Sequence, residues 1–218
     1  ITAAQLTVSI NLAAYALAQL VHGPVADAIG RRRLLLGAFI AFALSSVACA
    51  LAPGMSWLLG GRFMQGLFSS VPSVVIVLMI RELYGPGRAL AVMAIYGAAL
   101  GMAPAIGPLI GGYLHVWFGW QAGFWFVAIL ALLVAAAFWR QVPESLLETR
   151  RLHLRGTLAA YGVLLSTPRF LRPALGVSLI FAALYAYVTT APVVFIELLG
   201  LPTERYGMTN LAVVSAFI

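Results

Sequence analysis

Long apolar runs separated by short polar segments dominate the chain. A helix needs about 20 apolar residues to cross the hydrocarbon core of a bilayer. By that measure the sequence predicts an all-α integral membrane bundle with about six and a half transmembrane helices. The spans are expected at residues 4–22, 34–52, 57–80, 89–114, 120–139 and 172–197, with a further one starting from about 206.

Composition agrees with a membrane protein, since 63% of the residues are hydrophobic and 9% are charged. All thirteen basic residues are arginine, and the formal net charge is +7. Such a charge could serve a nucleic-acid partner, but the arginines lie between apolar spans, so we attribute them to membrane topology and expect no nucleic acid. The single Cys49 lies in an apolar run and is expected to be a packing residue.

Arginine occurs in alternate turns of the predicted bundle. The segments 23–33, 81–88 and 140–171 carry it, whereas the turns 53–56 and 115–119 carry none. Because basic residues favour the cytoplasmic side of a membrane, the central loop should be cytoplasmic and residue 1 should lie outside.

The segment 140–171 divides the chain. Its leucines and Tyr161 recur at helical spacing, which predicts a short amphipathic helix on the membrane surface. We expect residues 1–139 to form an N-terminal bundle, 140–171 a central cytoplasmic loop and 172–218 the start of a second bundle. The chain begins at Ile and stops inside an apolar run, so we expect it to be a fragment.

Two predicted spans carry polar stripes. In the first span Thr7, Asn11, Tyr15 and Gln19 recur every fourth residue, and polar groups facing lipid would lack partners. This stripe could make interhelical hydrogen bonds or line a transport path. In the span 57–80, the side chains that share one face within about 80° are Arg62, Gln65, Ser69 and Ser73.

Arg62 lies within the predicted span 57–80. A charged residue at the centre of a membrane helix costs roughly 2.5–3.5 kcal/mol by insertion scales, so it usually has a partner and a function. Because Trp57 is only five residues away, the side chain could instead extend to the outer interface.

The spans 89–114 and 172–197 have other features. Internal prolines bend a helix and glycines admit a close neighbour, which indicates a bent, closely packed helix at Gly97, Gly101, Pro104, Gly107, Pro108, Gly111 and Gly112. In the last span, Tyr185 and Tyr187 could contact an aromatic or cationic substrate or simply pack. The three histidines show no metal-ligand spacing, and neither an enzyme signature nor a metal site is predicted.

Three motifs resemble one known family. Residues 23–33 read Gly-x-x-x-Asp-x-x-Gly-Arg-Arg-Arg, which resembles the loop between helices 2 and 3 of the major facilitator superfamily. More narrowly, it is similar to its proton-coupled drug antiporters of the bicyclomycin and chloramphenicol resistance group. Leu58-x-x-x-Arg62-x-x-Gln65-Gly66 resembles the family's fourth-helix signature, and residues 103–112 resemble its antiporter signature. Ala28 and Ala103 depart from these patterns, at a basic and a glycine position.

The resemblance identifies the spans as helices 2–8 of a twelve-helix fold and implies roles for residues. Arg62 is expected to take part in proton coupling. A cytoplasmic gate network is expected at Gly23, Asp27, Gly30, Arg31 and Glu82, although the arginines could also simply face anionic headgroups as a topology determinant. The antiporter-type part of helix 5 is expected at Pro104, Gly107, Pro108, Gly111 and Gly112. The polar and aromatic faces predict a substrate cavity at Asn11, Tyr15, Gln19, Gln65, Ser69, Tyr185 and Tyr187.

The function implied by the resemblance is secondary active transport in the bacterial inner membrane. Hydrophobic, amphipathic or cationic drugs would be exported in exchange for protons by alternating access, with no cofactor beyond the proton gradient. The expected partners are the small-molecule substrate, protons and the lipid bilayer, and the full-length protein should be a monomer. The proton-binding carboxylate is expected in helix 1, which the chain lacks. A metabolite uniporter or symporter of the same fold, and a non-transporting fragment or assembly subunit, are the alternatives.

Overall fold

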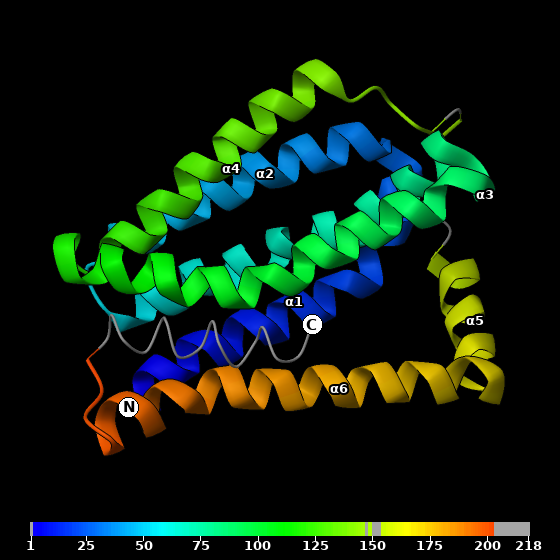
Figure 1. Ribbon diagram of the computed structural model, residues 1–218. Helices are drawn as coiled ribbons and strands as arrows, with labels where there is room; N and C mark the ends of the chain where they lie inside the picture. The colour runs from blue at the N-terminus through cyan, green and yellow to red at the C-terminus, as the bar shows by residue number, and fades with distance from the viewer. Residues whose placement is uncertain (1, 147, 150–153, 203–218) are drawn as a thin grey trace.

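In the computed structural model, residues 2–146, 148–149 and 154–202 are described, and their regular structure is helical throughout (Figure 1). This confirms the predicted all-α fold. The elements are α1 (Thr2–Ile29), α2 (Arg31–Ala50), α3 (Met55–Phe118), α4 (Gln121–Gln141), α5 (Leu154–Leu165), α6 (Pro168–Pro192) and the short π-helix η1 (Val193–Leu198).

The 64-residue α3 contains two of the predicted spans. It doubles back at Gly85 (Figure 1), where the backbone leaves helical geometry with φ 64° and ψ 178°. A positive φ of this kind favours glycine, which has no Cβ to clash. We call residues 55–84 the first limb of α3 and residues 86–118 the second limb.

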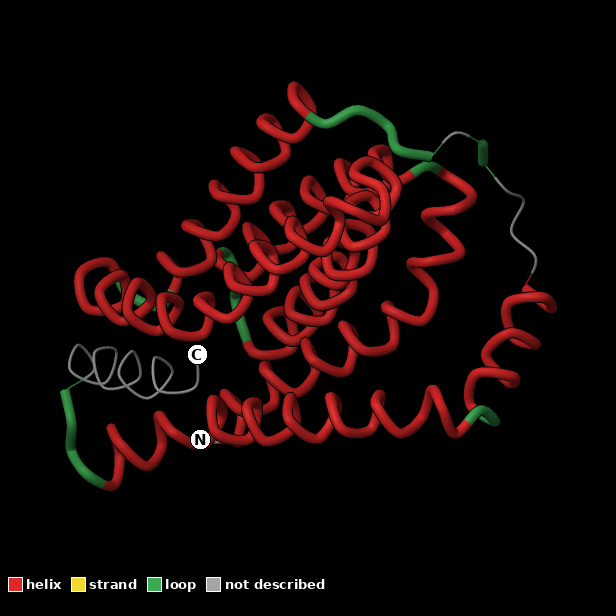
Figure 2. Tube along the Cα trace, turned by 45° about the vertical axis from the view of Figure 1, so that its right-hand side comes forward, coloured by secondary structure: helices red, strands yellow, loops and turns green. Residues whose placement is uncertain are grey.

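Among the described residues, four helices are long and apolar enough to cross a membrane: α1, α2, α3 and α4. The helices around the α5–α6 bend, Gly156–Leu165 and Pro168–Ala183, meet at 81° and pass the same test only together. Figure 2 shows this sharp turn between α5 and α6. The short helix predicted in the segment 140–171 is α5, while the further span expected from residue 206 lies outside the described residues.

The expected loop at residues 23–33 is wrong in its extent. Helix α1 continues to Ile29, Gly30 alone forms the turn with φ 102°, and Arg31 begins α2. Proline has no N–H for the carbonyl four residues earlier, so Pro24 leaves the carbonyl of Leu20 without its helical donor. The hydroxyl of Tyr161, on α5, donates a hydrogen bond to that carbonyl. Gly23 is therefore a helical residue and does not form the reversal.

Small residues allow the helices to approach closely. At the crossing of α1 and α3, a Cβ on Gly66 would lie 2.2 Å from the backbone oxygen of Asn11 and 3.0 Å from Cβ of Ala14. Helix α2 packs against both α3 and α4, and the buried cluster at one end of the bundle joins α1, α2 and α3. Close packing of small side chains is the usual basis of helix association in membranes.

Candidate functional site

The side chain of Arg62 lies inside the bundle, where it contacts α1 and its own helix. Its Nη1 donates to Oε1 of Gln65, and its Nε donates to the backbone oxygen of Thr7 at 3.4 Å. The amide of Asn11 donates to the backbone oxygen of Arg62 at 2.9 Å. These bonds fix the guanidinium toward α1 rather than toward the outer interface that we considered as the alternative.

Gln65 connects Arg62 to α2. Its side chain is 3% exposed, and its Nε2 donates to Oγ of Ser46 at 2.7 Å. The hydroxyl of Ser46 itself donates to the backbone oxygen of Phe42 at 2.8 Å. An ordered chain of hydrogen bonds therefore runs from α2 through Gln65 to the guanidinium, and each member restrains the next.

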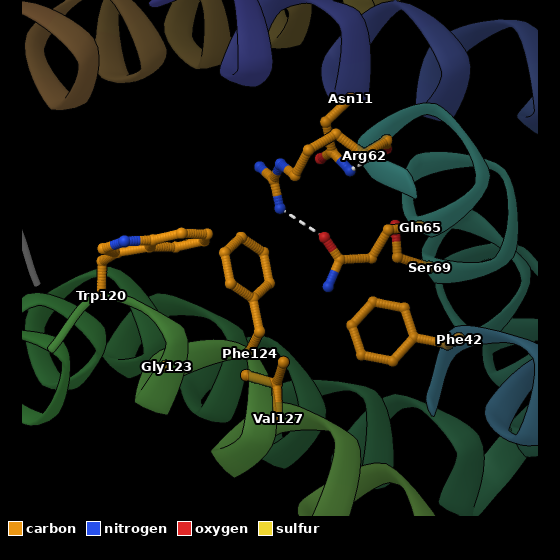
Figure 3. A pocket seen from close by; sticks show the side chains of 9 residues that line it. All are labelled: Asn11, Phe42, Arg62, Gln65, Ser69, Trp120, Gly123, Phe124 and Val127. Atoms are coloured by element: carbon orange, nitrogen blue, oxygen red, sulfur yellow. Dashed lines mark hydrogen bonds between the residues drawn. The ribbon is translucent and has the colours of Figure 1, made fainter. Parts of the chain in front are cut away.

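A cavity of about 370 Å³ opens beside this chain of bonds. The guanidinium carbon of Arg62 lies 5.8 Å from the ring centroid of Phe124, within cation–π range. Figure 3 shows the side chains around the cavity, where Trp120, at the N-cap of α4, and Phe124, on α4, face Arg62. The lining residues are Asn11, Phe42, Arg62, Gln65, Ser69, Trp120, Gly123, Phe124 and Val127. This combination of a few polar groups with aromatic walls is typical of small-molecule sites.

The structure brings some predicted cavity residues together and leaves others apart. Asn11, Gln65 and Ser69 line the cavity with Arg62, whereas Tyr15 and Gln19 do not. Gln19 instead donates to Ser73 at 3.1 Å. This is an interhelical hydrogen bond, one of the two roles considered for the polar stripe of the first span.

Among the described side chains of α6, that of Tyr187 does not line this cavity. The hydroxyl of Tyr187 is buried without a hydrogen-bond partner among the described residues, and the side chain of Tyr185 lies outside them. Conversely, the sequence reasoning missed Phe42, Phe124 and the cavity position of Trp120. An apolar helix such as α4 offers no polar face from which their orientation could be inferred.

At the arginine-bearing end of the bundle, Arg31 joins three helices. Its Nη1 lies 2.9 Å from Oδ1 of Asp27 on α1, and its Nη2 lies 2.8 Å from Oε1 of Glu82 on α3. The Arg31 side chain is only 6% exposed. A buried guanidinium needs such charged acceptors because the desolvation penalty is otherwise not offset. The predicted pairing of Asp27, Arg31 and Glu82 is thus present, while Gly23 takes no part in it.

Two further residues complete this network, and the sequence analysis did not single them out. Oε1 of Glu144 accepts the backbone N–H of Arg31 at 3.0 Å, and Oε2 accepts that of Arg32 at 3.1 Å. The hydroxyl of Ser145 donates to Oε2 of Glu82 at 2.6 Å. Glu144 therefore supplies the anion at the N-terminus of α2, where free N–H groups and the helix dipole favour negative charge.

The residues expected to mark an antiporter-type helix lie in the second limb of α3. Nothing lies within 4 Å of a Cβ placed on Gly107 or Gly111, whereas Gly112 is buried and Pro108 is half-buried. The side chain of Pro104 lies outside the described residues. Gly85 is the residue of α3 with non-helical angles, so the backbone stays helical through the prolines.

The family model described as Major Facilitator Superfamily matches residues 1–218. The chain belongs to this superfamily, and it is a multi-pass membrane protein.

Among its relatives are proteins named for drug resistance. It is 30% identical over 194 residues to a bicyclomycin resistance protein homolog of Haemophilus influenzae, covering 88% of this chain and 49% of that protein. It is 35% identical over 142 residues to a chloramphenicol resistance protein of Pseudomonas aeruginosa, covering 65% of this chain and 34% of that protein. It is 30% identical over 200 residues to the multidrug transporter MdfA of Edwardsiella piscicida, covering 90% of this chain and 48% of that protein. The chain thus spans a third to a half of these relatives, and the resemblance to the resistance group is confirmed.

Proposed function

We propose that the chain is part of a secondary active transporter that exports hydrophobic or amphipathic drugs in exchange for protons. The names of the relatives support drug export. The single observation that carries the proposal is the cavity in which Arg62 faces the aromatic rings of Trp120 and Phe124. A flat lipophilic compound would contact Trp120 and Phe124, while the amides of Asn11 and Gln65 would bind its polar groups.

The role of Arg62 in this proposal is electrostatic. A guanidinium stays protonated at physiological pH, so Arg62 does not itself bind and release the transported proton. A fixed positive charge lowers the pKa of a nearby carboxyl group and therefore controls when that group releases its proton. No carboxylate lines the cavity among the described residues, so the proton-binding acid of this proposal belongs to a helix outside them.

The cytoplasmic gate and the orientation belong to the same proposal. The network around Arg31 lies at the end of the bundle that carries the arginine-rich turns. The positive-inside rule assigns that end to the cytoplasm of a bacterial inner membrane. There the network would hold the cytoplasmic mouth closed while the cavity faces outward, and alternating access would open and close it.

The test is drug-induced proton movement in inverted membrane vesicles that contain the protein expressed from its complete reading frame. After acidification of the vesicle lumen by respiration, added chloramphenicol should release protons in the wild type. Arg62→Ala should abolish this release at unchanged expression, because the charge that controls the acid is gone. Ser45→Ala, in which the lost hydroxyl contacts only backbone of its own helix, is the matched control.

Other results would contradict the proposal in distinct ways. Full proton release in Arg62→Ala would remove the coupling role. Drug uptake without proton release would favour a uniporter, and proton movement in the same direction as the substrate would favour a symporter. An absence of any drug movement, in a protein that is expressed and folded, would favour the non-transporting alternative.

A further inference from the structure

Glu144 holds the N-terminus of α2 from a position more than a hundred residues later in the chain. Its carboxylate accepts the backbone N–H groups of Arg31 and Arg32, and also those of Ser145 and Leu146 at 3.1 and 3.3 Å. Bonds from peptide N–H groups to an ionised carboxylate are stronger than those to a neutral acceptor. The arginines of the first turn of α2 add positive charge that a helix N-terminus otherwise disfavours, and Glu144 offsets it.

Gly30 provides the space for this carboxylate. A Cβ at residue 30 would lie 2.8 Å from Oε2 of Glu144, so the carboxylate occupies the position next to the turn where a side chain would otherwise be. The glycine is thus required twice, for its φ of 102° and for the bound anion. Gly30 was predicted as a member of the gate network, and this is the contact through which it takes part.

The contacts form a closed ring. Glu144 binds the backbone of Arg31, the guanidinium of Arg31 binds Asp27 and Glu82, and Glu82 accepts the hydroxyl of Ser145. Glu144 and Ser145 are adjacent, so the chain after α4 is hydrogen-bonded to the network at two points. A second contact points the same way: Nη2 of Arg32 donates to the backbone oxygen of Trp139 at 2.5 Å.

We propose that Glu144 is a positioning residue of the cytoplasmic gate. It holds Arg31 between the carboxylates of Asp27 and Glu82, and it fastens the start of the segment 140–171 to the first three helices. This inference rests on the proposed function, because a gate is needed only if this end of the protein opens and closes. The segment leads on to α5 and α6, so an intact ring opposes separation of these helices from the bundle and favours the closed cytoplasmic mouth.

A simple helix cap would have a different consequence. Loss of a cap lowers stability but does not change which mouth of the protein is open. A gate residue, in contrast, shifts the balance between the two states when its contacts are removed. The measurement that separates the two is the ratio of accessibilities at the two ends of one helix.

The experiment uses single cysteine reporters on α1, in protein expressed from its complete reading frame and reconstituted in liposomes. Leu20→Cys reports the arginine-bearing end and Leu6→Cys the opposite end, since both side chains are exposed among the described residues. Cys49 is 0% exposed and can be retained. The reaction rate with a water-soluble maleimide is measured at each position, and the Leu20→Cys to Leu6→Cys ratio is compared between variants.

For Glu144→Gln we expect this ratio to rise about tenfold, the size expected when hydrogen bonds to a charged group are replaced by neutral ones. Glu144→Asp keeps the charge but shortens the side chain, so it should raise the ratio by a smaller factor. Glu148→Gln, which removes an exposed acid from the same segment, is the matched control and should leave the ratio within about twofold of wild type.

An unchanged ratio in folded Glu144→Gln, even with a lower melting temperature, would overturn the proposal and leave only a helix cap. An equal rise in Glu148→Gln would overturn it in favour of a general charge effect. If Glu144→Gln does not fold, the ratio in Glu144→Asp decides, because an unchanged value there also overturns the proposal. The ratio requires no drug transport, so a failure of the proposed function is recognised separately by the vesicle assay.

Discussion

The crossing of α1 and α3 at Gly66 gives the sharpest prediction on stability. In Gly66→Ala the new methyl group would lie 2.2 Å from the backbone oxygen of Asn11. An ordinary contact between carbon and oxygen needs about 3.3 Å, so the two helices must separate by about 1 Å. Neither atom belongs to a flexible side chain, and the strain therefore cannot be relieved locally. Overpacking of this kind costs about 1–3 kcal/mol.

The separation would also affect the candidate site, because the Asn11 side chain donates to the backbone of Arg62. We expect Gly66→Ala to lower the melting temperature of the purified protein, measured by the fluorescence of a thiol-reactive dye at Cys49, and to reduce drug export. Gly60→Ala on the same limb of α3 is the control, since nothing lies within 4 Å of its Cβ position. Alanine is the better helix former by about 1 kcal/mol, so the control should be as stable as wild type or more stable. Equal melting temperatures for the two variants would refute the packing argument.

Two further predictions concern single hydroxyl groups. Ser46→Ala removes the acceptor of the buried Gln65 amide, which should lower the free energy of unfolding by about 1–3 kcal/mol. It should also reduce drug export at normal expression, whereas Ser45→Ala should not. Equal export by the two variants would show that the Gln65 bond does not orient Arg62. Tyr161→Phe removes the donor to the Leu20 carbonyl, so limited trypsin digestion within the segment 140–171 should be roughly fivefold faster. The control Tyr84→Phe, at an exposed position, should be digested at the wild-type rate. A wild-type digestion rate in Tyr161→Phe would mean that this bond does not hold α5 on α1.

Much of the fold could be predicted because membrane helices are recognised by length and apolarity. The spans 34–52 and 120–139 correspond to α2 and α4 within a few residues. The prediction failed at residues 23–29, where glycine and proline indicated a loop. Local sequence could not reveal that Tyr161, far along the chain, gives the Leu20 carbonyl the hydrogen-bond donor that Pro24 lacks. Helix boundaries here depend on a tertiary contact.

The candidate site could be predicted only where polarity gave a direction. Arg62 and Gln65 stood out because a polar group in an apolar helix needs a partner. Phe42 and Phe124 did not stand out, because a helix that is apolar all round has no distinct face. Glu144 was missed for another reason: it follows a proline at the end of a span, and its partners are peptide N–H groups, which no sequence motif displays.

The reversals at Gly30 and Gly85 leave almost no free chain between consecutive helices at this end of the bundle. The first limb of α3, which carries Arg62, is therefore joined to the second limb through Gly85 alone. By contrast, residues 142–146 follow α4 without regular structure, and the contacts of Glu144 and Ser145 hold them to the bundle. Release of these contacts would free the chain to bend there, between α4 and the helices that follow it.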